Sequence, residues 1–202
     1  MSDGKNGEVS MNYATLNGKN QWEVLRLYTF KSFEDGIYRR DAVLETNRNI
    51  SYNLADIPLP NGVLRIDKVS VPDPTTLRLG HYTLPEIEGN TFSIEKSKQV
   101  PEAVIIGNGE YKLATVPLID SWDKTTVYYP TGLHPVSEQC SLIMSEKAVT
   151  NKHVMVTLHL WKKGNKPFSK KELTPVKEVK VADDLNHVEI TFADNTIKTV
   201  SF

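Results

Sequence analysis

The amino-acid sequence predicts an all-β protein, a two-layer antiparallel β-sandwich of roughly ten to twelve strands. Short apolar runs with strand-like alternation recur about every 8 to 12 residues. Gly, Pro, Asn and Asp separate these runs, as tight turns require. Helical periodicity nowhere extends beyond about two turns. Two packed antiparallel sheets are therefore the expected way to bury the apolar residues.

The clearest strand is VMVTLHLWKK, residues 154–163. Successive strand side chains point to opposite faces, and one face here is entirely apolar: Val154, Val156, Leu158 and Leu160. The other face carries Met155, Thr157, His159 and Trp161. Because the run is rich in β-branched residues and lacks Pro and Gly, we expect it at the centre of a sheet.

The chain is predicted to form one domain behind a short tail. Residues 1–12 are polar and rich in Gly and Asn, so we expect a disordered or added tail there. Residues 13–202 are assigned to a single β-sandwich domain, since all-β folds often reach this length. Cys140 is the only cysteine, which excludes an internal disulfide framework.

Strands and loops alternate in the first part of this domain. QWEVLRLYTF, residues 21–30, is predicted to be the first strand. The polar segment that follows is interpreted as extended loop and turn, with a brief helical stretch at residues 41–46. Residues 63–71 are expected to form a strand that Pro72 and Pro74 end.

The strongest local signal is a hairpin at residues 103–116, where Asn108-Gly109 supplies the positive φ values of a tight turn. Further short strands are expected at residues 77–84, 90–96, 125–129 and 141–144. After the central strand, SKKEL is predicted to form a single helical turn capped by Ser169. The C-terminus adds three strands: VKEVKV, HVEITF and IKTVSF.

Charge is unevenly distributed along the chain. The net charge of -1 gives no global field that favours nucleic acid, and no nucleic-acid partner is expected. Residues 147–180 nevertheless hold nine lysines against Glu172 and Glu178, a local balance of +7. This stretch is either a surface loop with sheet edges that lysines protect from pairing with other chains, or a patch that meets an acidic glycan or an acidic partner domain.

Membrane and export signals are not found in the sequence. No apolar run approaches the roughly 20 residues that cross a bilayer, so no membrane partner is expected. The N-terminus, MSDGKNGEVS, lacks the apolar segment of a secretory signal. The expected location is periplasmic or cytoplasmic, if the chain belongs to a larger bacterial protein.

Catalytic candidates are Tyr38, Arg39, Arg40 and His134. Arginine can bind a carboxylate through two hydrogen bonds and tyrosine can transfer a proton, which an enzyme acting beside a uronate needs. His134 lies in a loop rich in Pro and Gly and is the histidine expected to be most exposed. The alternative is that the arginines and Asp41 brace the loop after the first strand.

Carbohydrate-binding candidates are Trp161, His159 and Trp122, because sugar rings stack on flat aromatic side chains. The alternative is that these tryptophans pack between the two layers. Neither a metal site nor a cofactor is predicted. The closest histidine spacing, His153 and His159, would separate the rings by about 20 Å along a strand.

Several segments carry a resemblance to a known family: WEVLRLYTF, GIYRRDAVLETN, YNLADIPLPNG, and TGLHPVSEQCSLI followed by VMVTLHLWKKG. They resemble the C-terminal β-sandwich that follows a helical toroid in Bacteroidetes-type two-domain proteins similar to heparinase II/III-type polysaccharide lyases. The resemblance implies that most of the cleft lies in a helical domain outside this chain. No catalytic residue of the family can be assigned here by motif.

The expected function is therefore a non-catalytic accessory β-sandwich of a carbohydrate-active protein. Such a domain would pack against a helical toroid and form part of a cleft for an oligo- or polysaccharide. By itself the chain is not expected to be a complete enzyme. Two alternatives stay open: a free-standing carbohydrate-binding module, or a lyase-like enzyme acting on acidic polysaccharide.

Overall fold

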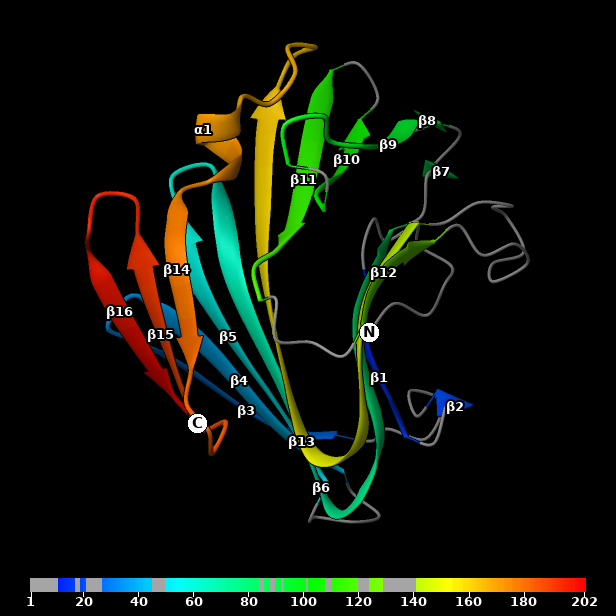
Figure 1. Cartoon of the computed structure of the whole chain (residues 1–202), viewed down its shortest axis with the longest axis vertical. Helices are drawn as coiled ribbons and strands as arrows, with labels where there is room; N and C mark the ends of the chain where they lie inside the picture. The colour runs from blue at the N-terminus through cyan, green and yellow to red at the C-terminus, as the bar shows by residue number, and fades with distance from the viewer. Residues whose placement is uncertain are drawn as a thin grey trace.

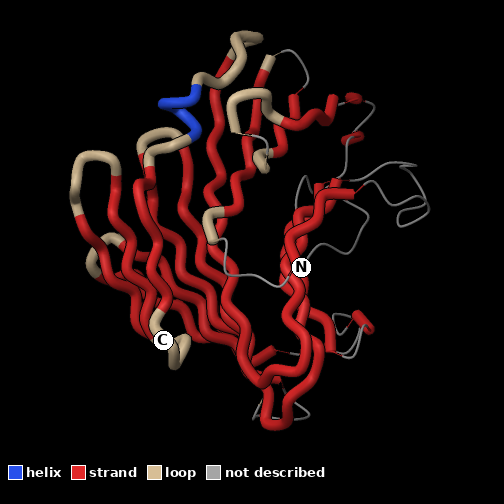
Figure 2. Tube along the Cα trace, in the orientation of Figure 1, coloured by secondary structure: helices blue, strands red, loops and turns tan. Residues whose placement is uncertain are grey.

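The described residues lie mostly in strands, which confirms the predicted all-β class (Figure 2). The computed structural model describes residues 11–16, 19–20, 27–44, 50–83, 86–87, 90–91, 93–100, 102–107, 110–119, 124–128 and 141–202. In these residues, antiparallel strands form an 11-stranded sheet, a three-stranded sheet and a two-stranded sheet. The first two of these sheets form the two layers of the sandwich (Figure 1).

The 11-stranded sheet contains β1 (Met11–Leu16), β2 (Lys19–Asn20), β3 (Leu27–Glu34), β4 (Ile37–Leu44), β5 (Ser51–Leu59), β6 (Gly62–Thr83), β9 (Ser93–Lys96), β10 (Val104–Gly107), β11 (Tyr111–Pro117), β12 (Lys124–Tyr128) and β13 (Ser141–Lys163). The three-stranded sheet contains β14 (Val176–Val181), β15 (His187–Phe192) and β16 (Ile197–Ser201). The two-stranded sheet pairs β7 (Glu86–Ile87) with β8 (Asn90–Thr91). In the part of the chain that the structure describes, the single helix is α1 (Lys170–Leu173).

Strand β13 lies at the centre of the large sheet, as its sequence predicts. The sheet order is β3-β4-β5-β6-β13-β11-β10-β9, so β13 is hydrogen-bonded to a neighbour on each side. In this register Val156 lies opposite Ile66 of β6, and Leu158 lies opposite Val116 of β11. The apolar faces of the three strands therefore coincide.

The large sheet bends sharply within its two longest strands (Figure 1). Strands β6 and β13 pair along most of their 22 and 23 residues, and their register shifts between Lys147 and Lys152. Beyond the bend they continue as a second arm with β1 and β12. The bend places the second arm beside one face of the main sheet. The second arm therefore covers part of that face and leaves the rest open.

The prediction that Pro72 and Pro74 end a strand is wrong, because β6 continues through both. Residues 71–74 pair with neither β5 nor β13, so the missing N–H groups of the prolines remove no ladder hydrogen bond. On the partner strand, Val149 has a φ of 47°. The prolines thus lie in the irregular stretch that bends the sheet.

The helical stretch predicted at residues 41–46 is also wrong, because Asp41 to Leu44 belong to β4 and residues 45–49 lie outside the described part. Asp41 pairs with Phe30 of β3 and with Asn53 of β5. The Asn53 amide also donates a 2.7 Å hydrogen bond to the Asp41 carboxylate. Pairing on both sides outweighs a weak local helix preference.

Other local predictions are confirmed. The 103–116 hairpin is present as β10 and β11. The Ser169 side chain caps α1 in a reciprocal arrangement with Glu172, a capping box. The three C-terminal strands form one sheet. The first predicted strand is described only from Leu27.

The prediction of extended loop and turn after the first strand, at residues 31–62, is wrong. Strand β3 continues to Glu34, and β4 and β5 follow it.

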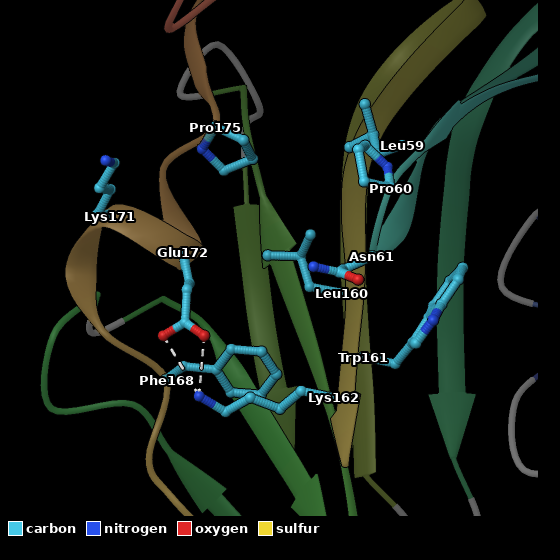
Figure 3. Close-up of a pocket in the computed structure, with 10 residues that line it drawn as sticks. All are labelled: Leu59, Pro60, Asn61, Leu160, Trp161, Lys162, Phe168, Lys171, Glu172 and Pro175. Carbon is cyan, nitrogen blue, oxygen red and sulfur yellow. Dashed lines mark hydrogen bonds and ion pairs between the residues drawn. The ribbon is translucent and has the colours of Figure 1, made fainter.

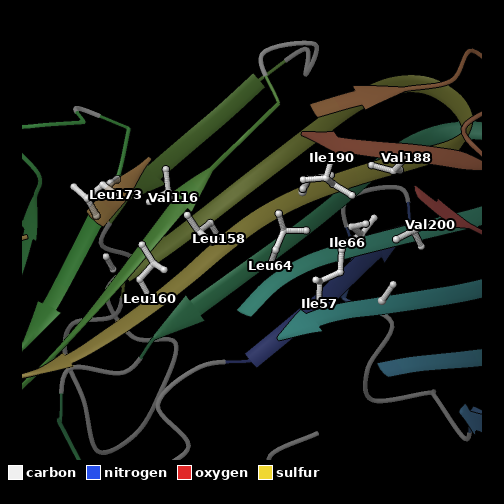
Figure 4. Close-up of a cluster of buried hydrophobic side chains, with 14 of the residues drawn as sticks. Ile57, Leu64, Ile66, Val116, Leu158, Leu160, Leu173, Val188, Ile190 and Val200 are labelled. Carbon is white, nitrogen blue, oxygen red and sulfur yellow. The ribbon is translucent and has the colours of Figure 1, made fainter. Parts of the chain in front are cut away.

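The main core lies between the large sheet and the three-stranded sheet (Figure 4). Its completely buried side chains include Leu64, Ile66, Val156, Leu158, Val188, Ile190 and Val200. Each contributes about 1.5 to 3 kcal/mol on burial. A second cluster lies inside the bend and is formed by Val69, Val71, Leu77, Leu79 and Met155.

Candidate functional site

The face of the large sheet that points away from the main core carries most of the candidate residues. In β13 this face is formed by Met155, Thr157, His159 and Trp161. We call it the inner face, because Leu77 and Leu79 of the second arm pack against Met155 on it. The opposite face of β13 lies in the main core.

An aromatic platform stands at one end of the inner face and consists of Trp161, Tyr111 and Lys163. The Trp161 and Tyr111 side chains are 50% and 51% exposed. Trp161 pairs with Leu113 of β11, and Tyr111 pairs with Lys163, so the two aromatic residues are diagonal neighbours roughly 7 Å apart. The Lys163 ammonium lies 5.8 Å from the centre of the Tyr111 ring. Flat apolar rings beside a cation suit stacking against a sugar.

His159 lies deeper on the same face. Its side chain is only 8% exposed, and its Nδ1 is hydrogen-bonded to the Thr115 hydroxyl at 3.2 Å. The structure thus gives Trp161 and His159 the shared face that the sequence predicts, but different environments. Trp122, the third carbohydrate-binding candidate, lies outside the described residues.

A partly buried ion pair occupies the middle of the inner face. Arg65 donates from Nε and Nη2 to the two carboxylate oxygens of Asp56, at 2.7 and 2.6 Å. Burial lowers the pKa of Arg65, but the hydrogen bond to Asp56 and the charges of Asp67 and Asp56 outweigh burial and raise it. The Tyr52 hydroxyl in turn donates to the Asp67 carboxylate. Arg65 therefore stays charged, and the Asp56 carboxylate stays hydrogen-bonded to it.

The catalytic candidates do not form one cluster. Tyr38 and Arg40 lie on the inner face, because they belong to the same alternating set as Asp56 and Leu54 across β5. Arg39 lies on the other face, where its Nη1 donates to the Ser201 carbonyl of β16. His134 lies outside the described residues. Strand alternation separates Arg39 from its two neighbours.

A pocket of about 220 Å³ lies on the core side of the same end of β13 (Figure 3). Its mostly apolar lining comes from the β5–β6 turn, the end of β13 and α1 with its flanking loops: Leu59, Pro60, Asn61, Leu160, Trp161, Lys162, Phe168, Lys171, Glu172 and Pro175. Figure 3 shows the Trp161 side chain on the opposite side of β13 from Phe168 and Lys162. The pocket and the platform are therefore back to back.

Two charged groups of this pocket, Lys162 and Glu172, neutralise each other. The Lys162 ammonium lies 3.0 Å from the Glu172 carboxylate, donates to the Pro167 carbonyl at 2.8 Å and lies 4.5 Å from the centre of the Phe168 ring. Hydrogen bonds from the Ser169 backbone and hydroxyl, and then from Lys162, lower the pKa of Glu172 to about 2. The ion pair fastens α1 to the strand.

Neither histidine of β13 stands in a metal-binding group. His153 Nε2 lies 2.8 Å from the Ser145 hydroxyl, within the bend. Among the residues that the structure describes, no three His, Cys, Asp or Glu side chains gather closely enough to hold a metal ion. In the same residues, no helix has the length and apolar character that a membrane span requires.

The fold and the site together define the class of this protein. It is a β-sandwich whose bent large sheet carries exposed aromatic side chains on its inner face. No protein-family model and no curated protein sequence matches this chain. Solved structures do: a heparan sulfate lyase from Pedobacter heparinus has a TM-score of 0.57 and 14% identity, over 94% of this chain and 30% of that one. A structure of heparinase III has a TM-score of 0.60 and 12% identity, over 94% of this chain and 29% of that one.

A protein assigned as a kojibiose phosphorylase from the human microbiome is also similar, with a TM-score of 0.50 and 7% identity over 75% of this chain and 22% of that one. At these identities the likeness is one of fold. It confirms the predicted resemblance to heparinase-type sandwiches. The chain spans about 30% of the length of the lyases it matches.

Proposed function

We propose that this chain is a non-catalytic accessory β-sandwich of a carbohydrate-active protein, and that its inner face forms one wall of a glycan cleft. The observation that carries this proposal is the aromatic platform, where two half-exposed aromatic side chains stand side by side. Large exposed aromatic residues at one place on a sheet favour a binding role over a packing role. The fold likeness to a heparan sulfate lyase makes a glycan the favoured ligand.

The accessory role is favoured by the size of the similar structures. Because this chain corresponds to about 30% of each similar lyase, the remaining parts of those proteins have no counterpart in it. We propose that residues 13–202 are one domain that packs against a helical toroid, and that the cleft lies between the two. The positive balance of residues 147–180 suits an acidic glycan or an acidic partner surface.

A second candidate is a free-standing carbohydrate-binding module, because the aromatic platform is already complete within this chain. The two candidates differ in where affinity resides. A module binds glycan by itself, whereas an accessory wall gains measurable affinity only beside its partner. The separation of Arg39 from Tyr38 and Arg40 gives the lyase-like alternative no comparable support.

The test is calorimetric titration of the chain with neutral and anionic oligosaccharides. Trp161→Ala should weaken any binding by about tenfold, because truncating one central aromatic residue typically removes more than 1 kcal/mol. Tyr111→Ala should act in the same direction. Ile197→Ala is the matched control, because it truncates an equally exposed apolar side chain on β16.

Saturable binding that Trp161→Ala weakens supports a glycan site and favours the module. If the isolated chain binds weakly or not at all, the same titration is repeated with a chain that contains the helical domain. Binding that appears there and depends on Trp161 favours the accessory role. Binding that Trp161→Ala and Tyr111→Ala leave unchanged would contradict both candidates.

A further inference from the structure

Two positive charges face each other at the far edge of the inner face. Lys31 of β3 and Arg40 of β4 are directly paired across the two strands. Like charges in this position destabilise a sheet, because their side chains are close and on the same face. Neither side chain has a hydrogen bond or ion pair within the described part of the chain. Arg40 is also half-buried, which increases the unfavourable effect.

Two aromatic residues lie immediately beside this pair. Phe33 of β3 is 66% exposed and pairs with Tyr38 of β4. We define the edge patch as Lys31, Phe33, Tyr38 and Arg40, two cross-strand pairs two residues apart on one face. The edge patch combines two flat aromatic rings, two cationic groups and the hydroxyl of Tyr38.

The nearby carboxylates do not neutralise the edge patch. Asp56 is the acidic residue opposite Tyr38 on β5, and both of its oxygens accept from Arg65. Asp67 lies one strand farther away and accepts from Tyr52. The patch therefore keeps its positive charge and offers it to a ligand.

We propose that the edge patch binds one anionic sugar unit, whose carboxylate or sulfate lies between Lys31 and Arg40 while its ring rests against Phe33 and Tyr38. This inference rests on the proposed function and adds to it a second subsite and its charge. In the sheet order, β3 is four strands from β13, roughly 19 Å at about 4.8 Å per strand. One sugar unit cannot reach both the patch and Trp161.

A simpler role for Lys31 is to protect the edge of the sheet, because β3 is the last strand in the described order. That role does not explain Arg40, which lies on the second strand and is half-buried. It also does not explain an exposed phenylalanine on an edge strand. An anionic sugar unit accounts for all three features, because its charge meets the two cations and its ring covers Phe33.

The experiment compares three probes by NMR titration of the folded chain: a tetrasaccharide containing uronate, cellotetraose as the neutral probe, and inorganic sulfate. Amide shifts of β3 and β4 should change with the uronate probe. Arg40→Gln should weaken its binding about tenfold, and Lys31→Gln should weaken it less because Lys31 is more exposed. Lys177→Gln, which removes an exposed charge from β14, should leave the affinity unchanged. Circular dichroism verifies that each variant is folded.

The outcomes separate this inference from the proposed function. Uronate binding that falls with Arg40→Gln, while cellotetraose binding does not, supports the edge patch as an anionic subsite. If Trp161→Ala weakens glycan binding and Arg40→Gln leaves it unchanged, the proposed function stands and the edge-patch inference is overturned. Shifts at the patch with sulfate but with neither sugar would keep an anion site and overturn its glycan role. No shift at the patch with either anion would overturn the inference.

Discussion

Leu160 and Trp161 are neighbours in the sequence, yet they serve different surfaces of the molecule. Leu160 lies in the main core and lines the pocket beside α1. Trp161 stands half-exposed on the inner face. The only cause of this division is the alternation of side chains along a strand. The same alternation places Arg40 on the inner face and sends Arg39 to Ser201.

Glu172 should make the stability of the protein depend on pH. Its folded-state pKa is about 2, below the ordinary value of 4.5, so folding favours the ionised carboxylate. The stabilisation is therefore fully present above about pH 4.5 and is lost as the pH falls toward 2. Because Glu172 is largely exposed, Glu172→Gln should lower the free energy of unfolding at pH 7 by less than about 1 kcal/mol.

Urea unfolding of the wild type and of Glu172→Gln, at pH 7 and near pH 2, measures this difference in the free energy of unfolding. Ser169→Ala should reproduce only part of the loss at pH 7, because it removes the hydroxyl hydrogen bond to Glu172 but keeps the backbone N–H, which is the largest contribution to the shift. A deficit in Glu172→Gln that is as large near pH 2 as at pH 7 would contradict the role of the charge.

Among the elements, β6 shows how a local rule and a long-range pairing combine. The hydrogen-bonded ladder of β6 is interrupted at the stretch that contains Pro72 and Pro74, where a sequence rule allows proline. The strand continues because β13 resumes pairing with it beyond the irregular stretch. The interruption therefore produces a bend rather than an end, and the bend creates the second arm.

Gly62 should be the glycine on which the β6–β13 pairing depends. A Cβ placed there would lie 2.3 Å from the His159 carbonyl oxygen and 2.8 Å from Cδ2 of Leu160. Gly62→Ala should therefore push the strand ends apart and lower the free energy of unfolding by about 1 to 3 kcal/mol. Chemical denaturation followed by tryptophan fluorescence measures the change.

Asn61→Ala is the matched control for this substitution. Asn61 is exposed, and it accepts the Trp161 N–H through its backbone carbonyl, which the substitution retains. It should change stability by less than about 0.5 kcal/mol. If Gly62→Ala were as stable as the wild type, the close approach of the two backbones would not be needed.

In the whole molecule, the three-stranded sheet completes the core of the large sheet. Its Val188, Ile190 and Val200 are buried against the large sheet. A polar contact joins the layers at one margin, where the Lys68 ammonium donates to the Asn186 side chain at 2.7 Å and lies 5.4 Å from the centre of the Phe202 ring. Burial, and then the nearby charge of Lys152, lowers the pKa of Lys68.

Removal of residues 176–202 should therefore prevent cooperative folding. It would expose the apolar face of β6 and β13, and an exposed patch of this kind is unstable in water. We expect the truncated chain to bind a hydrophobic dye and to lose a sharp thermal transition. Ile197→Ala, which changes only an exposed side chain in that sheet, should melt like the wild type. A sharp transition in the truncated chain would show that the large sheet folds alone.

Elements with strong local signals were predictable from sequence. The 103–116 hairpin, the capped turn at Ser169 and the central strand all depend on residues close together in the chain. The conformation of residues 41–44 was not predictable in this way, because the neighbouring strands decide it. The exposed tryptophan could be proposed from its strand face, whereas its companion Tyr111 could not.

By itself, the sequence determined that the protein is all-β, which face of β13 is apolar, and that residues 103–116 form a hairpin. These properties depend on side chains that are near one another along the chain. Only the tertiary structure decided that Tyr111 stands beside Trp161 and that Lys31 faces Arg40. The physical reason is that strand alternation is local, whereas the neighbour across a sheet depends on the register that all the strands set together.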